Sequence, residues 1–293
     1  MKSESTGHLE RTANQPRAPT LHKVRIRSIQ EPNDNIRILQ LEIPDHGTIG
    51  FLPGQWLDVY VPGVPKAGGF TITSPPSKAK PSSEGSPGYL ELAIQKSPDN
   101  APAAWLWQPR ERVLGSELEV RVGGSFVWPP SGVAVHTLRT AVFVAGGVGI
   151  NPLMSMLSAI AERPCSFEVD LLYSVRVKPV DGASSDIATA KILFLERIAG
   201  LFGEGKIRGT LKLFLTGGLG DGKGTIFYNG THVHFEKRRL TIDDVAHAVG
   251  PDQRLSVVYV CGVPTMTDEV VERLTSPDGL DMEPHRVLCE KWW

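Results

Sequence analysis

Three glycines follow one of the most apolar stretches of the chain. Residues 141–145 (AVFVA) form an uninterrupted apolar run, which is typical of a strand buried on both faces of a parallel sheet. Gly146, Gly147 and Gly149 come next, and then Pro152, which favours the first turn of a helix. Glycine lets backbone N–H groups approach a ligand closely, and a helix N-terminus attracts a pyrophosphate. Because the spacing is not GxGxxG, a glycine-rich turn without a ligand stays open as the alternative.

Other residues able to do chemistry stand near the ends of further apolar runs. Tyr173, Ser174 and Arg176 close one run, Cys261 closes another, and residues 290–293 read EKWW. Two adjacent tryptophans expose much apolar area unless they cover something. Without a ligand, Arg176 is an ordinary surface arginine, Cys261 is a small buried hydrophobe, and the tryptophans only pack for stability.

Two different patterns surround these residues. Between residues 21 and 122, six short runs alternate apolar and polar residues: VRIRSI, IRILQLEI, GQWLDVYV, GGFTIT, YLELAI and ELEVRV. They predict an antiparallel β-barrel or sandwich. After residue 138, apolar runs alternate with helical patterns, which predicts an α/β domain with a parallel sheet. We expect an unstructured segment over 1–20, a barrel over 21–133 and a nucleotide-binding domain over 138–293.

Composition excludes several classes of function. Hydrophobic residues make up 41% of the chain and charged residues 22%, as in ordinary globular proteins. The formal net charge of −1 argues against a nucleic-acid partner, and no apolar run approaches the roughly 18 residues of a membrane span. The three cysteines form no CxxC, and His232 and His234 lack a third ligand nearby, so no metal site is expected. The low cysteine count and the absence of an apolar signal segment favour an intracellular compartment.

Five ordered motifs give the chain a family resemblance. PGQW, GGFTITSPP, VRVGGSF, AGGVGINPL and the EKWW ending occur in that order. The chain resembles the ferredoxin–NADP⁺ reductase superfamily over residues 21–293, and within it the oxidoreductase NAD-binding-domain-containing proteins. The resemblance implies a flavin-type β-barrel followed by an NAD(P)-binding α/β domain, and a mitochondrial location, with the cytoplasm as the alternative.

The resemblance implies an FAD site on the barrel. The superfamily's arginine-x-tyrosine-serine/threonine motif matches residues 68–71, so that an aromatic ring and the hydroxyl near flavin N5 are retained, whereas Gly68 replaces the arginine that pairs with the pyrophosphate. A serine found in many relatives before the next helix is Ala103 or Ala104 here. A second phosphate-facing loop matches residues 123–125. The implied FAD-binding residues are Gly69, Phe70, Thr71, Gly123, Gly124 and Ser125; without FAD, the same residues are ordinary barrel strands and turns.

The resemblance also implies a nicotinamide-nucleotide site on the second domain. Arg176 and its neighbours correspond to the position that meets the adenosine ribose or its 2′-phosphate, so NAD and NADP both stay open. Cys261 corresponds to a thiol near nicotinamide C4, Glu290 to a nearby carboxylate, and Trp292 to an aromatic that stacks on the flavin. The implied nucleotide-binding residues are Gly146, Gly147, Val148, Gly149, Pro152, Tyr173, Ser174, Arg176, Cys261, Gly262, Met266 and Trp292.

The expected function follows from these two sites. We expect an enzyme that transfers hydride from NAD(P)H to FAD and then passes electrons to an unidentified acceptor, with Thr71, Cys261, Glu290 and Trp292 nearest the chemistry. The alternative is a non-catalytic module that binds a nicotinamide nucleotide without tight FAD, which the glycine at position 68 favours.

Overall fold

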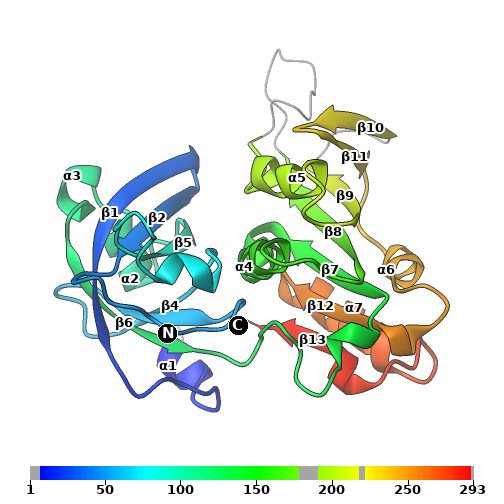
Figure 1. Ribbon diagram of the computed structural model, residues 1–293, viewed down its shortest axis with the longest axis horizontal. Helices are drawn as coiled ribbons and strands as arrows, with labels where there is room; N and C mark the ends of the chain where they lie inside the picture. The colour runs from blue at the N-terminus through cyan, green and yellow to red at the C-terminus, as the bar shows by residue number, and fades with distance from the viewer. Residues whose placement is uncertain (1–6, 178–190, 218–221, 292–293) are drawn as a thin grey trace, which may run out of the picture. The chain divides into compact units, whose positions relative to one another are not determined.

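The computed structural model describes residues 7–177, 191–217 and 222–291. The chain divides into two compact units, Met1–Trp128 and Pro129–Trp292, which are coloured blue to green and green to red in Figure 1. The structure confirms an antiparallel barrel followed by an α/β domain. No helix in the described ranges is long and apolar enough to cross a membrane.

The first unit is a closed barrel. Its six-stranded antiparallel sheet has the order β4-β3-β6-β1-β2-β5, and an antiparallel bridge between Ile72 and Leu92 joins the two edges. Short helices fill the connections. The elements are α1 (His8–Arg11), β1 (His22–Asn33), β2 (Ile36–Glu42), β3 (Trp56–Tyr60), β4 (Gly68–Thr71), η1 (Pro76–Ala79), β5 (Tyr89–Gln95), α2 (Ala101–Leu106), α3 (Arg110–Val113) and β6 (Glu117–Gly123).

Strand alternation separates the inside of the barrel from its outer face. Leu57 and Val59 of β3 and Val122 of β6 belong to the buried hydrophobic cluster inside the barrel. Trp56 and Asp58 alternate with them and therefore point outward, yet both side chains are fully buried. Something must cover them on the outside.

The cover is the segment before β1. The expectation that residues 1–20 lack fixed structure is wrong for residues 7–20, which are described and include α1. Arg17 forms an antiparallel bridge to Gly123, and the Ala18 N–H donates to Val122 O at 2.8 Å. The polar composition of this segment predicted disorder. The prediction failed because the segment is held by residues that lie 41 to 110 positions away in the chain, which no local pattern reveals.

The second unit is a three-layer α/β domain. Its seven-stranded sheet has the order β10-β11-β9-β8-β7-β12-β13, parallel except for the antiparallel pair β10–β11. Helices α4 and α5 lie against one face, and α6 and α7 against the other (Figure 1). The elements are η2 (Val135–Thr137), β7 (Thr140–Gly146), η3 (Gly147–Gly149), α4 (Ile150–Ala161), β8 (Glu168–Arg176), α5 (Leu195–Gly203), β9 (Gly209–Thr216), β10 (Lys223–Tyr228), β11 (Thr231–Glu236), α6 (Ile242–Val249), η5 (Gln253–Leu255), β12 (Ser256–Cys261), α7 (Pro264–Thr275), η6 (Pro284–Arg286) and β13 (Val287–Glu290).

The apolar runs of the sequence form the middle of this sheet. Every residue of β12 is buried, as are residues 141–145 of β7. The start of α6 has the expected capping box, in which the Thr241 N–H donates to Asp244 Oδ2 at 2.9 Å. The carboxyl ends of parallel strands lie along one edge of the sheet, and the candidate site is at that edge.

Candidate functional site

A cavity of about 420 Å³ opens at the carboxyl ends of β7, β8, β9 and β12. Ligands of open α/β sheets characteristically bind at this edge. Five of the residues expected to bind the nucleotide line the cavity: Gly146, Gly147, Ser174, Arg176 and Met266. The remaining lining residues were not expected from the sequence: Thr216, Arg239, Leu240, Thr241, Ile242, Val263, Thr265, Glu269 and Val270.

The glycine turn has one open and one closed position. Gly147 adopts φ +55°, and a Cβ there would meet nothing within 4 Å. Gly149 is buried, and a Cβ there would lie 2.1 Å from the carbonyl oxygen of Cys261. Gly147 therefore faces the cavity, whereas Gly149 allows the start of α4 to pack against the end of β12.

Several expected ligand residues support the cavity instead of lining it. Tyr173 is buried, and its hydroxyl donates to Gly147 O at 3.3 Å and Leu193 O at 3.4 Å. Burial raises the pKa of this phenol, so the hydroxyl stays protonated. Its hydrogen bond to Gly147 O fixes the glycine turn. The other expected residues that are absent from the lining of this cavity are Val148, Gly149, Pro152, Cys261 and Gly262.

The cavity is positively charged on one side. Arg176 and Arg239 are both exposed, and within the part of the chain that the structure describes neither guanidinium forms an ion pair. Glu269 is the only carboxylate among the lining residues that the structure describes. No pattern in the sequence pairs Arg239 with Arg176, because Arg176 ends β8 and Arg239 lies in the loop between β11 and α6, and only the folded sheet brings them to one cavity.

Glu290 lies at the same edge of the sheet. In the parallel pair β12–β13 it is the partner of Cys261, and it is only 8% exposed. Burial raises the pKa of this carboxyl to about 8, so at neutral pH it is mainly a neutral acid that holds a proton. Trp292, the expected stacking residue, lies outside the described residues.

A larger cavity, of about 970 Å³, lies between β9, the β10–β11 hairpin and α6. Two of its cationic side chains are paired with carboxylates: Lys212 with Glu236 at 2.5 Å, and Arg238 with Asp244 at 2.6 Å. Asp170 and Asp243 also line this cavity, so that carboxylates outnumber the cationic side chains Lys212, Lys223 and Arg238 among its described lining residues, and the smaller cavity is the better nucleotide site.

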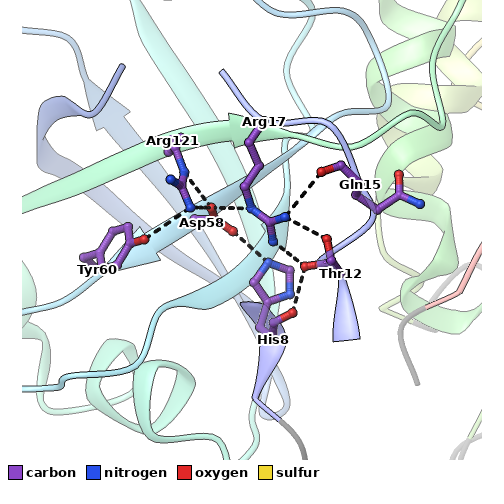
Figure 2. Close-up of polar contacts among 7 residues, drawn as sticks. All are labelled: His8, Thr12, Gln15, Arg17, Asp58, Tyr60 and Arg121. Carbon is purple, nitrogen blue, oxygen red and sulfur yellow. Dashed lines mark hydrogen bonds and ion pairs between the residues drawn. The ribbon is translucent and has the colours of Figure 1, made fainter. Parts of the chain in front are cut away.

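The outer face of the barrel carries a buried charge cluster (Figure 2). The Asp58 carboxylate accepts hydrogen bonds from His8 Nε2 at 2.9 Å, Arg17 Nε at 2.9 Å and Arg121 Nη2 at 2.7 Å. Burial by itself raises the pKa of Asp58, but the hydrogen bonds from His8, Arg121 and Arg17 outweigh it and hold the pKa below its usual value. The ring of His8 also meets the Trp56 ring edge-on, with centroids 4.7 Å apart.

Comparison with known proteins identifies the family. Over 302 residues the chain is 31% identical to oxidoreductase NAD-binding domain-containing protein 1 of Xenopus laevis, covering 99% of this chain and 85% of the relative. The Danio rerio relative is 31% identical over 98% of both chains. The chain belongs to the oxidoreductase NAD-binding domain-containing protein 1 family.

Comparison with solved structures identifies the fold. The ferredoxin reductase of carbazole 1,9a-dioxygenase superposes with a TM-score of 0.62 at 16% identity, covering 94% of this chain and 70% of that protein. The fold of this family member is thus that of the ferredoxin–NADP⁺ reductase superfamily. No protein-family model matches the chain.

The barrel of this family member does not fit FAD in the conformation described. A Cβ at Gly68 would lie 2.5 Å from the Phe70 ring and 2.8 Å from Pro102, so the arginine of related reductases has no room. A Cβ at Gly69 would lie 2.1 Å from the His8 ring, and Thr71 is only 6% exposed.

The loop over residues 123–125, which the resemblance assigned to the FAD phosphates, is bonded to another part of the chain. Gln15 Oε1 accepts hydrogen bonds from Ser125 N at 3.2 Å and Ser125 Oγ at 2.7 Å. The Gly124 N–H donates to Pro16 O at 2.9 Å. A Cβ at Gly123 would lie 2.5 Å from the Trp56 ring. Four of the six residues that the family resemblance assigned to FAD therefore contact the chain's own 7–17 segment: Gly69, Gly123, Gly124 and Ser125.

Proposed function

We propose that this chain is an NAD(P)H-dependent oxidoreductase whose nicotinamide nucleotide binds in the 420 Å³ cavity. One observation carries the proposal: the cavity combines the open glycine turn at the start of α4 with the guanidinium groups of Arg176 and Arg239. Backbone N–H groups at a helix N-terminus favour a pyrophosphate, and guanidinium groups form charge-assisted hydrogen bonds to phosphate oxygens.

Each part of the site has a separate role in this proposal. Gly147 admits the pyrophosphate because no side chain stands in front of the turn, and Tyr173 keeps the turn in place. Arg176 and Arg239 bind the phosphates. Met266, whose side chain lies next to Gly146 and Gly262, supplies an apolar wall for a ring. Glu290 retains a proton near neutral pH because it is buried.

A second candidate function is a module that binds NAD(P)H without turnover. It is favoured by the crowding around Gly68 and by the segment that covers the barrel motif. The two candidates share the nucleotide site and differ in whether the bound nucleotide is oxidised.

Two measurements test the proposal on the full chain. Calorimetric titration with NADH and with NADPH is expected to show saturable binding, and the loss of reduced-nucleotide absorbance with ferricyanide as acceptor is expected to show turnover. Binding without turnover supports the non-catalytic module. Absence of binding by both nucleotides rejects both candidates.

A further inference from the structure

Two consecutive arginines in the loop 237–241, which runs from β11 to α6 (Figure 1), line different cavities. Arg239 lines the 420 Å³ cavity of the proposed nucleotide site, whereas Arg238 lines the larger cavity. Residues 240–242 continue the wall of the smaller cavity. Four consecutive residues of the nucleotide site therefore depend on how this loop is held.

The guanidinium of Arg238 uses all of its nitrogens to hold the loop. Nε donates to Glu236 Oε2 at 2.5 Å, and Nη2 donates to Asp244 Oδ1 at 2.7 Å. Nη1 donates both to Asp244 Oδ2 at 2.6 Å and to the carbonyl oxygen of Arg239 at 2.9 Å. Because two parallel hydrogen bonds to one carboxylate fix direction as well as distance, Arg238 fixes the peptide unit that follows Arg239.

Asp244 joins this side chain to the start of α6. Its Oδ2 also accepts hydrogen bonds from Thr241 N and Thr241 Oγ1, both at 2.9 Å. Burial raises the pKa of Asp244, but the hydrogen bonds from Arg238 and Thr241 outweigh it and hold the pKa well below its usual value. One ionised carboxylate thus holds the loop on both sides of Arg239.

The sheet anchors the same guanidinium from below. Lys212 of β9 pairs with Glu236 of β11 at 2.5 Å, and Cζ of Arg238 lies 5.1 Å from the ring centroid of Phe214. A cation at this distance over an aromatic face is attracted by the ring, and Phe214 is fully buried. Arg238 is therefore tied to two strands, whereas the Arg239 guanidinium forms no ion pair within the described ranges and is left for a ligand.

We propose that Arg238 is a positioning residue for the nicotinamide nucleotide: it holds Arg239 where a phosphate oxygen meets it and does not contact the phosphate itself. This inference rests on the proposed function and extends it to a residue outside the nucleotide cavity. Every hydrogen bond of Arg238 is to the chain. The two cations and two carboxylates of its network cancel, so the network acts on the cavity through geometry and not through net charge.

A double-mutant cycle on the full chain, with NADH affinity measured by calorimetry, tests this role. Arg238→Gln removes the bonds to Asp244 and to Arg239 O, and it is expected to weaken NADH binding about fivefold. In the Arg239→Ala background the same change is expected to weaken binding less than about twofold, because the residue that Arg238 positions is gone.

The matched control is Arg254→Gln. Arg254 also pairs through Nε with a carboxylate two positions earlier, Asp252, at 3.3 Å. It lies in η5, before β12, whereas the nucleotide cavity opens at the carboxyl end of that strand. This variant is expected to bind NADH as the wild type does.

Arg238→Lys separates positioning from charge. Lysine keeps the positive charge but lacks the planar fork that reaches Asp244 and Arg239 O together. It is therefore expected to bind NADH as weakly as Arg238→Gln, to within about twofold. This variant also serves in the cycle if circular dichroism shows that Arg238→Gln does not fold.

The outcomes separate positioning from a general structural role. A loss confined to chains that keep Arg239 supports the proposal. A loss of equal size in both backgrounds means that Arg238 acts independently of Arg239 and overturns it, as does wild-type affinity for Arg238→Gln or Arg238→Lys. A wild-type chain that binds neither NADH nor NADPH rejects the proposed function itself, so the two failures are distinguished.

Discussion

The Cα atom of Gly149 lies against the carbonyl group of Cys261, so closely that a Cβ on residue 149 would stand 2.1 Å from the oxygen and 2.4 Å from the carbon. This contact joins the start of α4 to the end of β12, two elements more than a hundred residues apart. It fixes the glycine turn relative to the strand that ends in Cys261. Glycine is therefore required at position 149 because α4 and β12 pack closely there. At position 147 the absence of a side chain leaves the cavity open.

Gly149→Ala is expected to destabilise the second unit. The added methyl group forces apart α4 and β12, and overpacking of this kind costs about 1–3 kcal/mol. Urea unfolding monitored by circular dichroism measures the change. Gly50→Ala is the control, because a Cβ at Gly50 meets nothing within 4 Å; equal stabilities for the two variants would contradict the packing argument.

Gly147→Asn is expected to impair nucleotide binding without unfolding the chain. Asparagine tolerates the left-handed backbone better than most residues, and the position is open, so its side chain extends into the cavity. We expect at least a tenfold loss of NADH affinity by calorimetry. Gly205→Asn, at φ +68° in open space away from the cavity, controls for backbone strain. Unaltered NADH binding by Gly147→Asn would show that the turn does not meet the ligand.

The two cavity arginines are expected to differ in what they recognise. Arg176→Ala weakens NADPH binding by about 1.5–3 kcal/mol and spares NADH if Arg176 contacts the 2′-phosphate. Arg239→Ala weakens both nucleotides if it contacts the shared pyrophosphate. Titration of each variant with both nucleotides separates these roles, with the exposed Arg273→Ala on α7 as control. Equal losses of both nucleotides on Arg176→Ala would reject the 2′-phosphate contact.

Glu290 is expected to make stability fall as pH rises. Its folded pKa of about 8 exceeds the ordinary value of 4.5 because it is buried, so the folded chain retains a proton that the unfolded chain releases. The stabilisation is complete below pH 4.5 and is lost as pH rises through about 8. Glu290→Gln removes this dependence, so above pH 8 the variant unfolds at higher urea concentration than the wild type.

The control for this pH series is Glu272→Gln, which alters an exposed carboxyl on α7. It is expected to leave the pH profile unchanged. Parallel profiles for wild type and Glu290→Gln between pH 5 and 9 would mean that the carboxyl at position 290 is ionised in the folded chain.

Local patterns in the sequence determined the architecture. The alternating runs before residue 123 predicted an antiparallel barrel, and the continuous run 141–145 with its glycines and Pro152 predicted a strand, turn and helix. Such patterns are short-range, because strand and helix periodicities are written in consecutive residues. That Gly147 and Arg176 belong to one nucleotide site was implied by the family resemblance and not by these patterns.

Only the tertiary structure decided which of these residues line the cavity and which support it. Tyr173 is buried and donates a hydrogen bond to Gly147 O. Arg239 lines the same cavity as Arg176, although it lies in a loop more than sixty residues later in the chain. Residues 7–15 gave no local sign of structure, because their stability comes from a buried carboxylate, Asp58, and a loop near residue 125. Contacts between residues so far apart depend on the folded barrel, and no periodicity in the sequence encodes them.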